Sequence, residues 1–211
     1  METSAITKTP IRVVVCDMDD VLADFCRSAL HIITQDPQNR RWYRRSPDTI
    51  LRHWPQGVTD LVEVLGMAPE LFWEQVDEWL FWRTLPVLPG AREFLASLQQ
   101  AGFRVMLASR PTLSAECWGA KVEWVQEELD GVLPGNPAHS LVLGRQKELL
   151  ARSDVLLVDD FPPNLQKFAG LGGETVMFPW HGNARRGEVG AKMHQRVLEE
   201  ILGKYEPKQE G

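Results

Sequence analysis

The stretch "VVVCDMDDVLADF", residues 13–25, joins an apolar, mostly β-branched run to a dense group of acids. The valine-rich run "IRVVVCD" (11–17) is typical of a strand that is buried on both faces of a parallel sheet. Four carboxylates follow within eight positions, at Asp17, Asp19, Asp20 and Asp24. Like charges this close repel one another strongly unless a cation lies between them. The stretch therefore predicts a buried strand that ends in acids grouped around a bound cation.

Four later runs resemble this first strand and extend the prediction to a whole sheet. They lie at residues 103–109, 140–144, 154–160 and 174–180. Helical patterns separate them, and those at 89–102 and 115–131 each close near a glycine. Strands that alternate with helices indicate an α/β fold with a Rossmann-like, mainly parallel sheet.

One long interval interrupts this alternation. Residues 24–85 have helical periodicity and turn signals without a convincing strand, and prolines divide them into short helices. We therefore expect a discontinuous α/β core, residues 11–23 and 86–205, with a small helical subdomain inserted at 24–85.

Composition narrows the class of protein and its surroundings. The chain has 211 residues and a formal net charge of −6, which argues against a nucleic-acid binder that depends on overall charge. Its three cysteines, Cys16, Cys26 and Cys117, have no metal-type spacing and suit a reducing compartment. No window approaches the roughly 20 apolar residues of a membrane span. We expect a cytoplasmic protein without a membrane partner.

Polar residues gather where the predicted strands end. In parallel sheets ligands bind beyond the carboxyl ends of the strands, so these residues are the first site candidates. They are Asp17, Asp19, Ser109, Arg110, Arg145, Lys147, Asp159 and Asp160. Each has a structural alternative, because such an Asp can cap a helix, such a Ser can form a turn and such a Lys can be solvated. Together they match Mg²⁺-assisted phosphoryl chemistry, in which acids hold the metal and a hydroxyl and cations hold phosphate oxygens.

The order of these residues resembles the haloacid dehalogenase-like hydrolases. "DMDDVLADF" is similar to the first motif of that superfamily, Ser109 to its second, Lys147 to its third and "VDD" (158–160) to its fourth. Within the superfamily the chain resembles the 5'(3')-deoxyribonucleotidases most, in "FWRTLPVLPGA", "LASRP", "GRQK" and "LLVDDFPPN". It departs from their pattern at three places: Asp20 replaces a Gly, Ser109–Arg110 replaces Thr-Ser, and Pro163 replaces an acid.

The resemblance implies a role for each candidate. Asp17 would be the nucleophile that forms an aspartyl-phosphate, and Asp19 the general acid and base. Mg²⁺ would be held by Asp17, by the backbone carbonyl of Asp19, and by Asp159 or Asp160. The phosphate would be bound by Ser109, the amide of Arg110, Arg145 and Lys147. For Asp24 we expect a helix-capping or hinge role, and for Asp20 an orientation away from the metal.

The inserted helices would then form a cap that closes over the site and supplies the leaving-group pocket. The family stacks a nucleobase on aromatic side chains there, and the candidates in this chain are Phe25, Trp73, Phe81 and Trp82. Aromatic residues in so small a unit can equally be its core. The substrate implied is a nucleoside monophosphate, preferably a deoxy form; the alternatives are a sugar phosphate or the phosphorylated end of a nucleic acid.

Two further possibilities concern other classes of protein and partner. A receiver-type signalling module shares an acidic pair, a hydroxyl and a Lys, but there the acidic pair comes first along the chain, and here it comes last. The run "RRWYRR" (40–45) fits either a nucleic-acid patch or a solvated, ion-paired loop. We favour the loop and expect no nucleic-acid partner. The sequence leaves a homodimer open.

Overall fold

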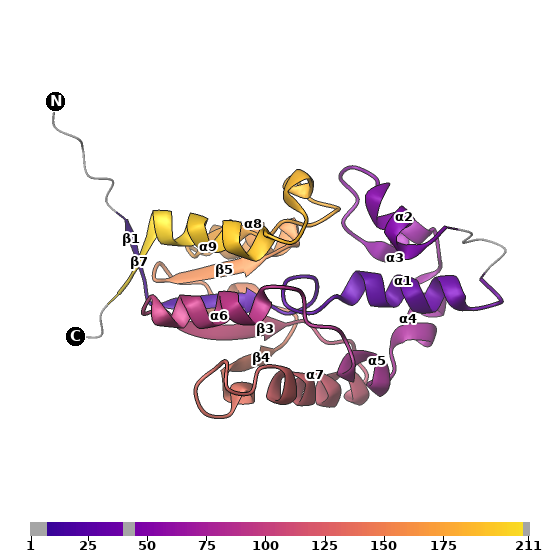
Figure 1. Cartoon of the computed structure of the whole chain (residues 1–211), viewed down its shortest axis with the longest axis horizontal. Coiled ribbons are helices and arrows are strands. Elements are labelled where there is room, and N and C mark those ends of the chain that lie inside the picture. Colours follow the sequence, from indigo (N-terminus) through magenta and orange to yellow (C-terminus); the bar gives the residue numbers. More distant parts are fainter. Residues whose placement is uncertain (1–7, 40–44, 209–211) are drawn as a thin grey trace.

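A computed structural model describes residues 8–39 and 45–208 of the chain. The basic run at 40–45 therefore lies, except for its last residue, outside the described residues. The core is a five-stranded sheet in which every pairing is parallel and the strand order is β4-β3-β2-β5-β6 (Figure 1). Its strands are β2 (Val13–Asp17), β3 (Arg104–Ser109), β4 (Leu141–Leu143), β5 (Val155–Asp159) and β6 (Glu174–Met177). The predicted α/β fold with its five parallel strands is confirmed.

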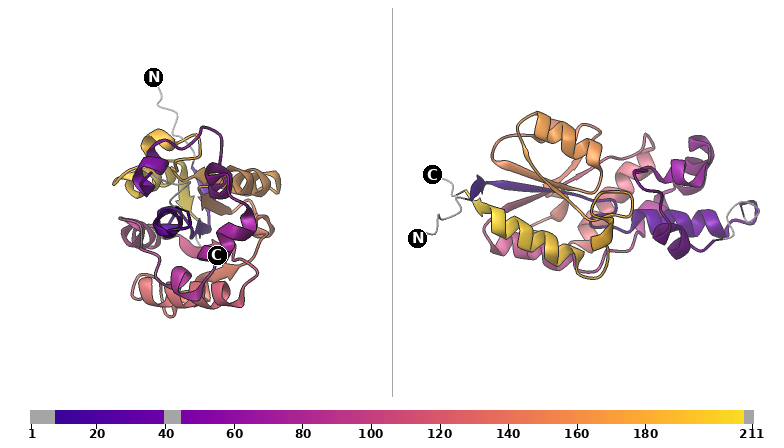
Figure 2. Two further views of the ribbon diagram at one scale, coloured as in Figure 1. Left: turned by 90° about the vertical axis from the view of Figure 1, so that its right-hand side faces the viewer. Right: turned by 90° about the horizontal axis from the view of Figure 1, so that it is seen from above.

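Helices cover both faces of this sheet, which explains the uninterrupted apolar runs. They are α6 (Ala91–Gln100), α7 (Ala115–Glu128), α8 (Pro162–Gly170) and α9 (Met193–Lys204). Alternate residues of β2 enter different clusters: Val14 packs with residues of α6, α7 and α9, and Val15 packs with Phe168 of α8. Figure 2 shows α8 and α9 on opposite sides of the strands. A strand buried on both faces needs apolar residues at every position.

A small second sheet was not predicted. The run at 11–17 is divided, because β1 (Thr9–Ile11) leaves the main sheet and pairs in parallel with β7 (Tyr205–Pro207) near the two termini. Three short 3-10 helices complete the core, η1 (Pro137–Ser140), η2 (Lys147–Leu150) and η3 (Arg186–Glu188). Of these, η2 matters most, because it begins at the candidate Lys147.

The described residues between 24 and 85 contain helices and no strand. The helices are α1 (Phe25–Gln35), α2 (Pro47–Arg52), α3 (Leu61–Leu65), α4 (Pro69–Val76) and α5 (Trp79–Arg83). Prolines begin α2 and α4, and the side chain of Asp60 accepts a hydrogen bond from the Val62 amide at the start of α3. Figure 1 places this group beyond the carboxyl ends of the strands. In the described part of the chain, no helix has the length and apolar character needed to cross a membrane.

Candidate active site

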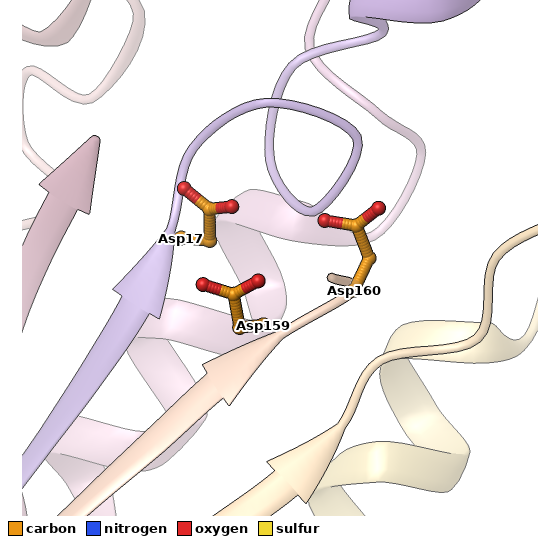
Figure 3. Close-up of side chains that lie close together, drawn as sticks. All are labelled: Asp17, Asp159 and Asp160. Carbon is orange, nitrogen blue, oxygen red and sulfur yellow. The ribbon is translucent and has the colours of Figure 1, made fainter. Parts of the chain in front are cut away.

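Three acids meet at the carboxyl ends of two neighbouring strands. Asp17 ends β2, Asp159 ends β5 and Asp160 follows directly (Figure 3). Each offers a carboxylate oxygen, and these oxygens lie within 4.8 Å of one another. A compact set of buried oxygen donors suits a hard divalent cation such as Mg²⁺. Asp19 was expected to offer its backbone carbonyl to the metal, and its carboxylate is not part of this group.

Lys147 lies inside the same cluster. Its Nζ is 2.6 Å from Asp17 Oδ1 and 2.8 Å from Asp159 Oδ2. Burial opposes the charge of this ammonium group, but the two carboxylates outweigh burial and hold the pKa of Lys147 above its usual value. Lys147 is therefore a fixed positive charge beside the acids.

One lysine does not neutralise the cluster. Burial, together with the charges of Asp159 and Asp19, raises the pKa of Asp17 to about 7, although Lys147 opposes this. Burial and the charges of Asp159, Asp20 and Asp17 raise the pKa of Asp160 well above its ordinary value. Acids that are this crowded hold protons unless a further cation replaces them. The donor set thus fits a bound divalent metal.

Asp159 is held by several donors. Besides Lys147, the amide of Phe161 donates to its Oδ1 at 2.9 Å, and Asn164 Nδ2 donates to its Oδ2 at 3.0 Å. Asn164 follows the two prolines that begin α8, so the turn into that helix fixes the acid.

Asp19 lies apart from these acids and has a cationic partner of its own. Lys121 Nζ, from α7, is 2.6 Å and 2.7 Å from the two oxygens of Asp19, and Ser109 Oγ donates to Asp19 Oδ2 at 3.4 Å. Lys121 is fully buried. It also lies 4.5 Å from the centre of the Trp82 ring. The sequence gives no signal for Lys121, because one lysine in an amphipathic helix is ordinarily solvated.

Asp20, and not Asp24 as expected, provides the side-chain cap at the start of α1. Asp24 occupies the N-cap position of α1, but its side chain makes no capping hydrogen bond and pairs instead with Arg27. Asp20 caps the helix in its place, since its Oδ1 accepts from the Cys26 amide at 2.9 Å. Its φ of 59° is the left-handed conformation that favours Gly, the residue that Asp20 replaces in the pattern that the sequence resembles.

A cavity of about 610 Å³ connects the acids to the aromatic residues. Most of the predicted site residues line it, namely Asp17, Asp19, Phe25, Trp73, Trp82, Arg110, Arg145, Lys147 and Asp160. Asp20 also lines it, and its carboxylate accepts from the Cys26 amide. Ser109, Asp159 and Phe81 lie behind the lining and support Asp19, Lys147 and Trp82 respectively.

Three of the aromatic rings stack with nearly parallel planes. Phe25 and Trp82 have centroids 5.4 Å apart and planes 9° apart, and Trp73 lies 6.3 Å from each. Phe81 packs edge-on against Trp82 with centroids 5.0 Å apart. Trp82 is 2% exposed, whereas Phe25 and Trp73 are only partly buried. Phe25 and Trp73 therefore keep some exposed surface, and both line the cavity.

Two arginines contribute positive charge at the cavity wall. Arg110 follows β3 and Arg145 follows β4, and both are exposed. Partial burial and the charge of Arg145 lower the pKa of Arg110, while Asp60 opposes this. In residues 8–39 and 45–208 neither guanidinium has an ion pair, so both can receive an anion.

A second cavity, of about 690 Å³, lies at the other end of the sheet. Its lining includes Arg12, Arg104 and Lys208 and contains no acid. It lacks the carboxylates that metal binding or nucleophilic chemistry requires, so the acid-lined cavity is the candidate active site.

Comparisons with known proteins agree with this geometry. A family model described as "5' nucleotidase, deoxy (Pyrimidine), cytosolic type C protein" matches residues 11–201. A search of curated proteins finds no match.

The fold is similar to that of several solved structures. One is a predicted phosphatase from Clostridium acetobutylicum, with a TM-score of 0.56, 13% identity and coverage of 90% of this chain and 99% of that chain. Another is a HAD hydrolase of family IA, variant 3, from Entamoeba histolytica HM-1:IMSS, with a TM-score of 0.53, 10% identity and coverage of 90% of this chain and all of that chain. The family model spans the sheet, the inserted helices and every candidate site residue. The fold is HAD-like, and the chain belongs to the family of cytosolic type C deoxy (pyrimidine) 5' nucleotidases and is a phosphoric monoester hydrolase.

Proposed function

We propose that this protein is a Mg²⁺-dependent phosphatase that hydrolyses deoxynucleoside monophosphates through an aspartyl-phosphate. One observation supports this above all: a single cavity joins a buried cluster of acids and a lysine to a stack of aromatic rings. The acids suit phosphoryl transfer, and the rings suit a flat leaving group such as a nucleoside. The family match supports the same substrate class.

Asp17 is the proposed nucleophile. Its Oδ1 accepts a hydrogen bond from the Met18 amide at 2.7 Å and lies 2.6 Å from Lys147 Nζ, so the carboxylate is held in one orientation. One of its oxygens attacks phosphorus as the bond to the ester oxygen breaks, which gives the aspartyl-phosphate and an alkoxide. Asp17, the backbone carbonyl of Asp19, and Asp160 or Asp159 would hold Mg²⁺, which would supply positive charge to the phosphate oxygens.

Asp19 is the proposed general acid and base. Protonated Asp19 gives its proton to the departing nucleoside oxygen and then accepts one from the water that attacks the aspartyl-phosphate. The second step releases inorganic phosphate and restores Asp17. The Lys121 ammonium and the Ser109 hydroxyl hold Asp19 in place through both steps.

The phosphate and the base then occupy opposite ends of the cavity. Arg110, Arg145 and Lys147 surround the phosphate with positive charge, and Ser109 lies behind the cavity lining, where it donates to Asp19. The base stacks on Phe25 and Trp73, which Trp82 supports from behind. In this proposal residues 24–85 form the cap and the remaining residues the core. The family's description also supports a cytosolic location.

A substrate panel tests the assignment. With Mg²⁺ present, kcat/KM for dUMP and dTMP is expected to exceed that for glucose 6-phosphate and for a 3'-phosphorylated oligonucleotide. Equal rates across the panel would leave a phosphatase without nucleotide preference, and faster hydrolysis of the oligonucleotide would favour a nucleic-acid end phosphatase.

Asp19→Asn tests the mechanism separately from the substrate. The variant should still fold, with lower stability because buried Lys121 keeps only a neutral amide oxygen as its partner. It should bind Mg²⁺, because the Asp19 carboxylate lies outside the three-acid cluster. It should lose nearly all turnover, since an amide cannot exchange the proton. Near-normal turnover of dUMP in this variant would rule out the role assigned to Asp19.

A further inference from the structure

The segment "PWHGN", residues 179–183, lies between the acids and the inserted helices and has no part in the mechanism above. It follows β6, where the amide of Phe178 donates to the carbonyl of Asp159 at 2.9 Å. Its last residue, Asn183, is 5% exposed. A buried amide side chain is stable only when its donors and acceptors are satisfied, so its partners indicate its role.

Asn183 uses both sides of its amide group. Its Nδ2 donates to the carbonyl oxygens of Asp160 and Phe178, each at 2.8 Å. Its Oδ1 accepts from the amides of Trp180 and Arg185, at 3.3 Å and 2.9 Å. Asn183 therefore ties the main chain of Asp160 to the turn that follows β6, immediately beside the acid cluster.

The opposite side of the segment touches the inserted helices. A Cβ at Gly182 would lie 2.5 Å from the carbonyl oxygen of Val58 and 2.9 Å from Trp54 Nε1, so only glycine fits. Trp54 donates to that same Val58 carbonyl at 2.6 Å. Trp180 packs edge-on against Trp54, with ring centroids 5.8 Å apart. The segment is thus closely fitted to the chain between α2 and α3.

We propose that Asn183 is a positioning residue for the metal ligand Asp160, and that residues 179–183 link this acid to the 54–58 turn of the inserted helices. The proposal rests on the proposed function, because it matters only if Asp160 helps to bind Mg²⁺. Groups that orient metal ligands affect metal affinity without touching the metal. Here Asn183 makes its orienting hydrogen bond to the main-chain carbonyl of Asp160. Gly182, the residue before Asn183, contacts the chain of the inserted helices.

The direct test is Mg²⁺ affinity, measured by isothermal titration calorimetry on the full chain. Asn183→Ala is expected to weaken Mg²⁺ binding by about tenfold or more, as changes to such orienting groups typically do. Asn183→Ser is a milder variant that is expected to fold even if Asn183→Ala does not. Its hydroxyl can still accept from the Arg185 amide, but it cannot replace both hydrogen bonds that Asn183 donates to the carbonyls of Asp160 and Phe178. Thermal melts of both variants confirm that they fold.

Arg185→Ala is the matched control in the same turn. The Arg185 side chain donates to the Met177 carbonyl and pairs with Glu188 and Glu200, without touching Asp160. Its removal should lower the melting temperature and leave Mg²⁺ affinity unchanged. An equal loss of Mg²⁺ affinity in this control would show that the Asn183 effect comes from a general loosening of the turn after β6, and this would overturn the proposal.

Gly182→Ala tests the link to the inserted helices. The collision with Val58 should shift Asn183, so Mg²⁺ affinity should fall by a smaller factor than in Asn183→Ala. Unchanged affinity in Gly182→Ala would overturn the link, and unchanged affinity in a folded Asn183→Ser would overturn the role of Asn183. Absence of Mg²⁺ binding by the parent protein would instead refute the proposed function.

Discussion

The Lys121 ammonium group lies where water cannot reach it. Such a charge is tolerated only if its partners compensate for lost hydration. Both oxygens of Asp19 do so at 2.6 Å and 2.7 Å, and the face of Trp82 lies 4.5 Å away. Lys121 consequently connects the proposed general acid to the aromatic stack, and a change at this residue should affect both.

Replacement of Lys121 by Met keeps most of the side-chain volume and removes the charge. We expect a loss of roughly 3 kcal/mol in the free energy of unfolding, the lower end of the usual cost of breaking a buried pair, because Asp19 is partly exposed. Turnover should also fall by more than about tenfold as Asp19 loses the donors that orient it. Urea unfolding and steady-state kinetics with dUMP measure the two effects.

The control is Lys167→Met on α8, an exposed lysine away from the site. It should change neither stability nor turnover appreciably. If Lys121→Met kept the turnover of this control, Lys121 would be a structural residue without influence on Asp19.

At the scale of single residues, the acids of the site can be predicted from the sequence, but the residues that pair with them cannot. Asp17, Asp159 and Asp160 lie at strand ends, so their convergence can be predicted. Lys121 is 102 positions from Asp19 and comes from a helix, and only the packing of α7 brings the two together. Asp20 replaced Asp24 as the helix cap because of a backbone φ that no residue pattern specifies.

At the scale of elements, the parallel strands were predictable and the two-stranded sheet was not. Every residue of β2 and β5 is buried, which requires the continuous apolar runs that the sequence displays. β1 and β7 have three residues each, too few for any periodicity to be evident. The inserted helices were predictable in kind from their helical periodicity and from the prolines that begin α2 and α4, but their stacking geometry depends on tertiary contacts.

Among those helices, α4 offers the best test of the proposed leaving-group pocket. Trp73→Ala removes a ring that is partly buried and lines the cavity, so it should raise KM for dUMP by about fivefold to a hundredfold, the range of one lost stacking contact. KM for glucose 6-phosphate should change little, because that substrate has no base to stack. Steady-state kinetics with both substrates measure the difference.

Trp79→Ala on the adjacent α5 is the control for a lost tryptophan. Trp79 is 42% exposed and does not line the cavity. Its removal should leave both KM values unchanged. Equal increases for dUMP and glucose 6-phosphate in Trp73→Ala would contradict base stacking and point to a general disturbance of the cap.

For the whole molecule, the acid cluster couples stability to pH. Burial raises the pKa of Asp17 to about 7 and that of Asp20 to about 8, from an ordinary value of 3.8. The folded protein thus keeps protons that the unfolded chain has released, and stability falls as pH rises through these values. His181 and His194, whose pKa values burial lowers, act in the opposite direction only below about pH 6.5.

The metal-free protein should therefore lose stability between pH 6.5 and pH 8.5, by up to about 1.4 kcal/mol per pH unit for each proton kept. Mg²⁺ should raise the melting temperature strongly at pH 8.5 and little at pH 5.5, because at low pH it must displace protons from the acids.

Asp20→Asn keeps the acceptor for Cys26 and removes one titrating group, so it should flatten the metal-free pH dependence. Calorimetric melts with EDTA and with Mg²⁺ measure all three effects. A metal-free melting temperature that rises from pH 6.5 to pH 8.5 would mean that the buried acids are already ionised without a metal, and the case for a cation among Asp17, Asp159 and Asp160 would lose its electrostatic basis.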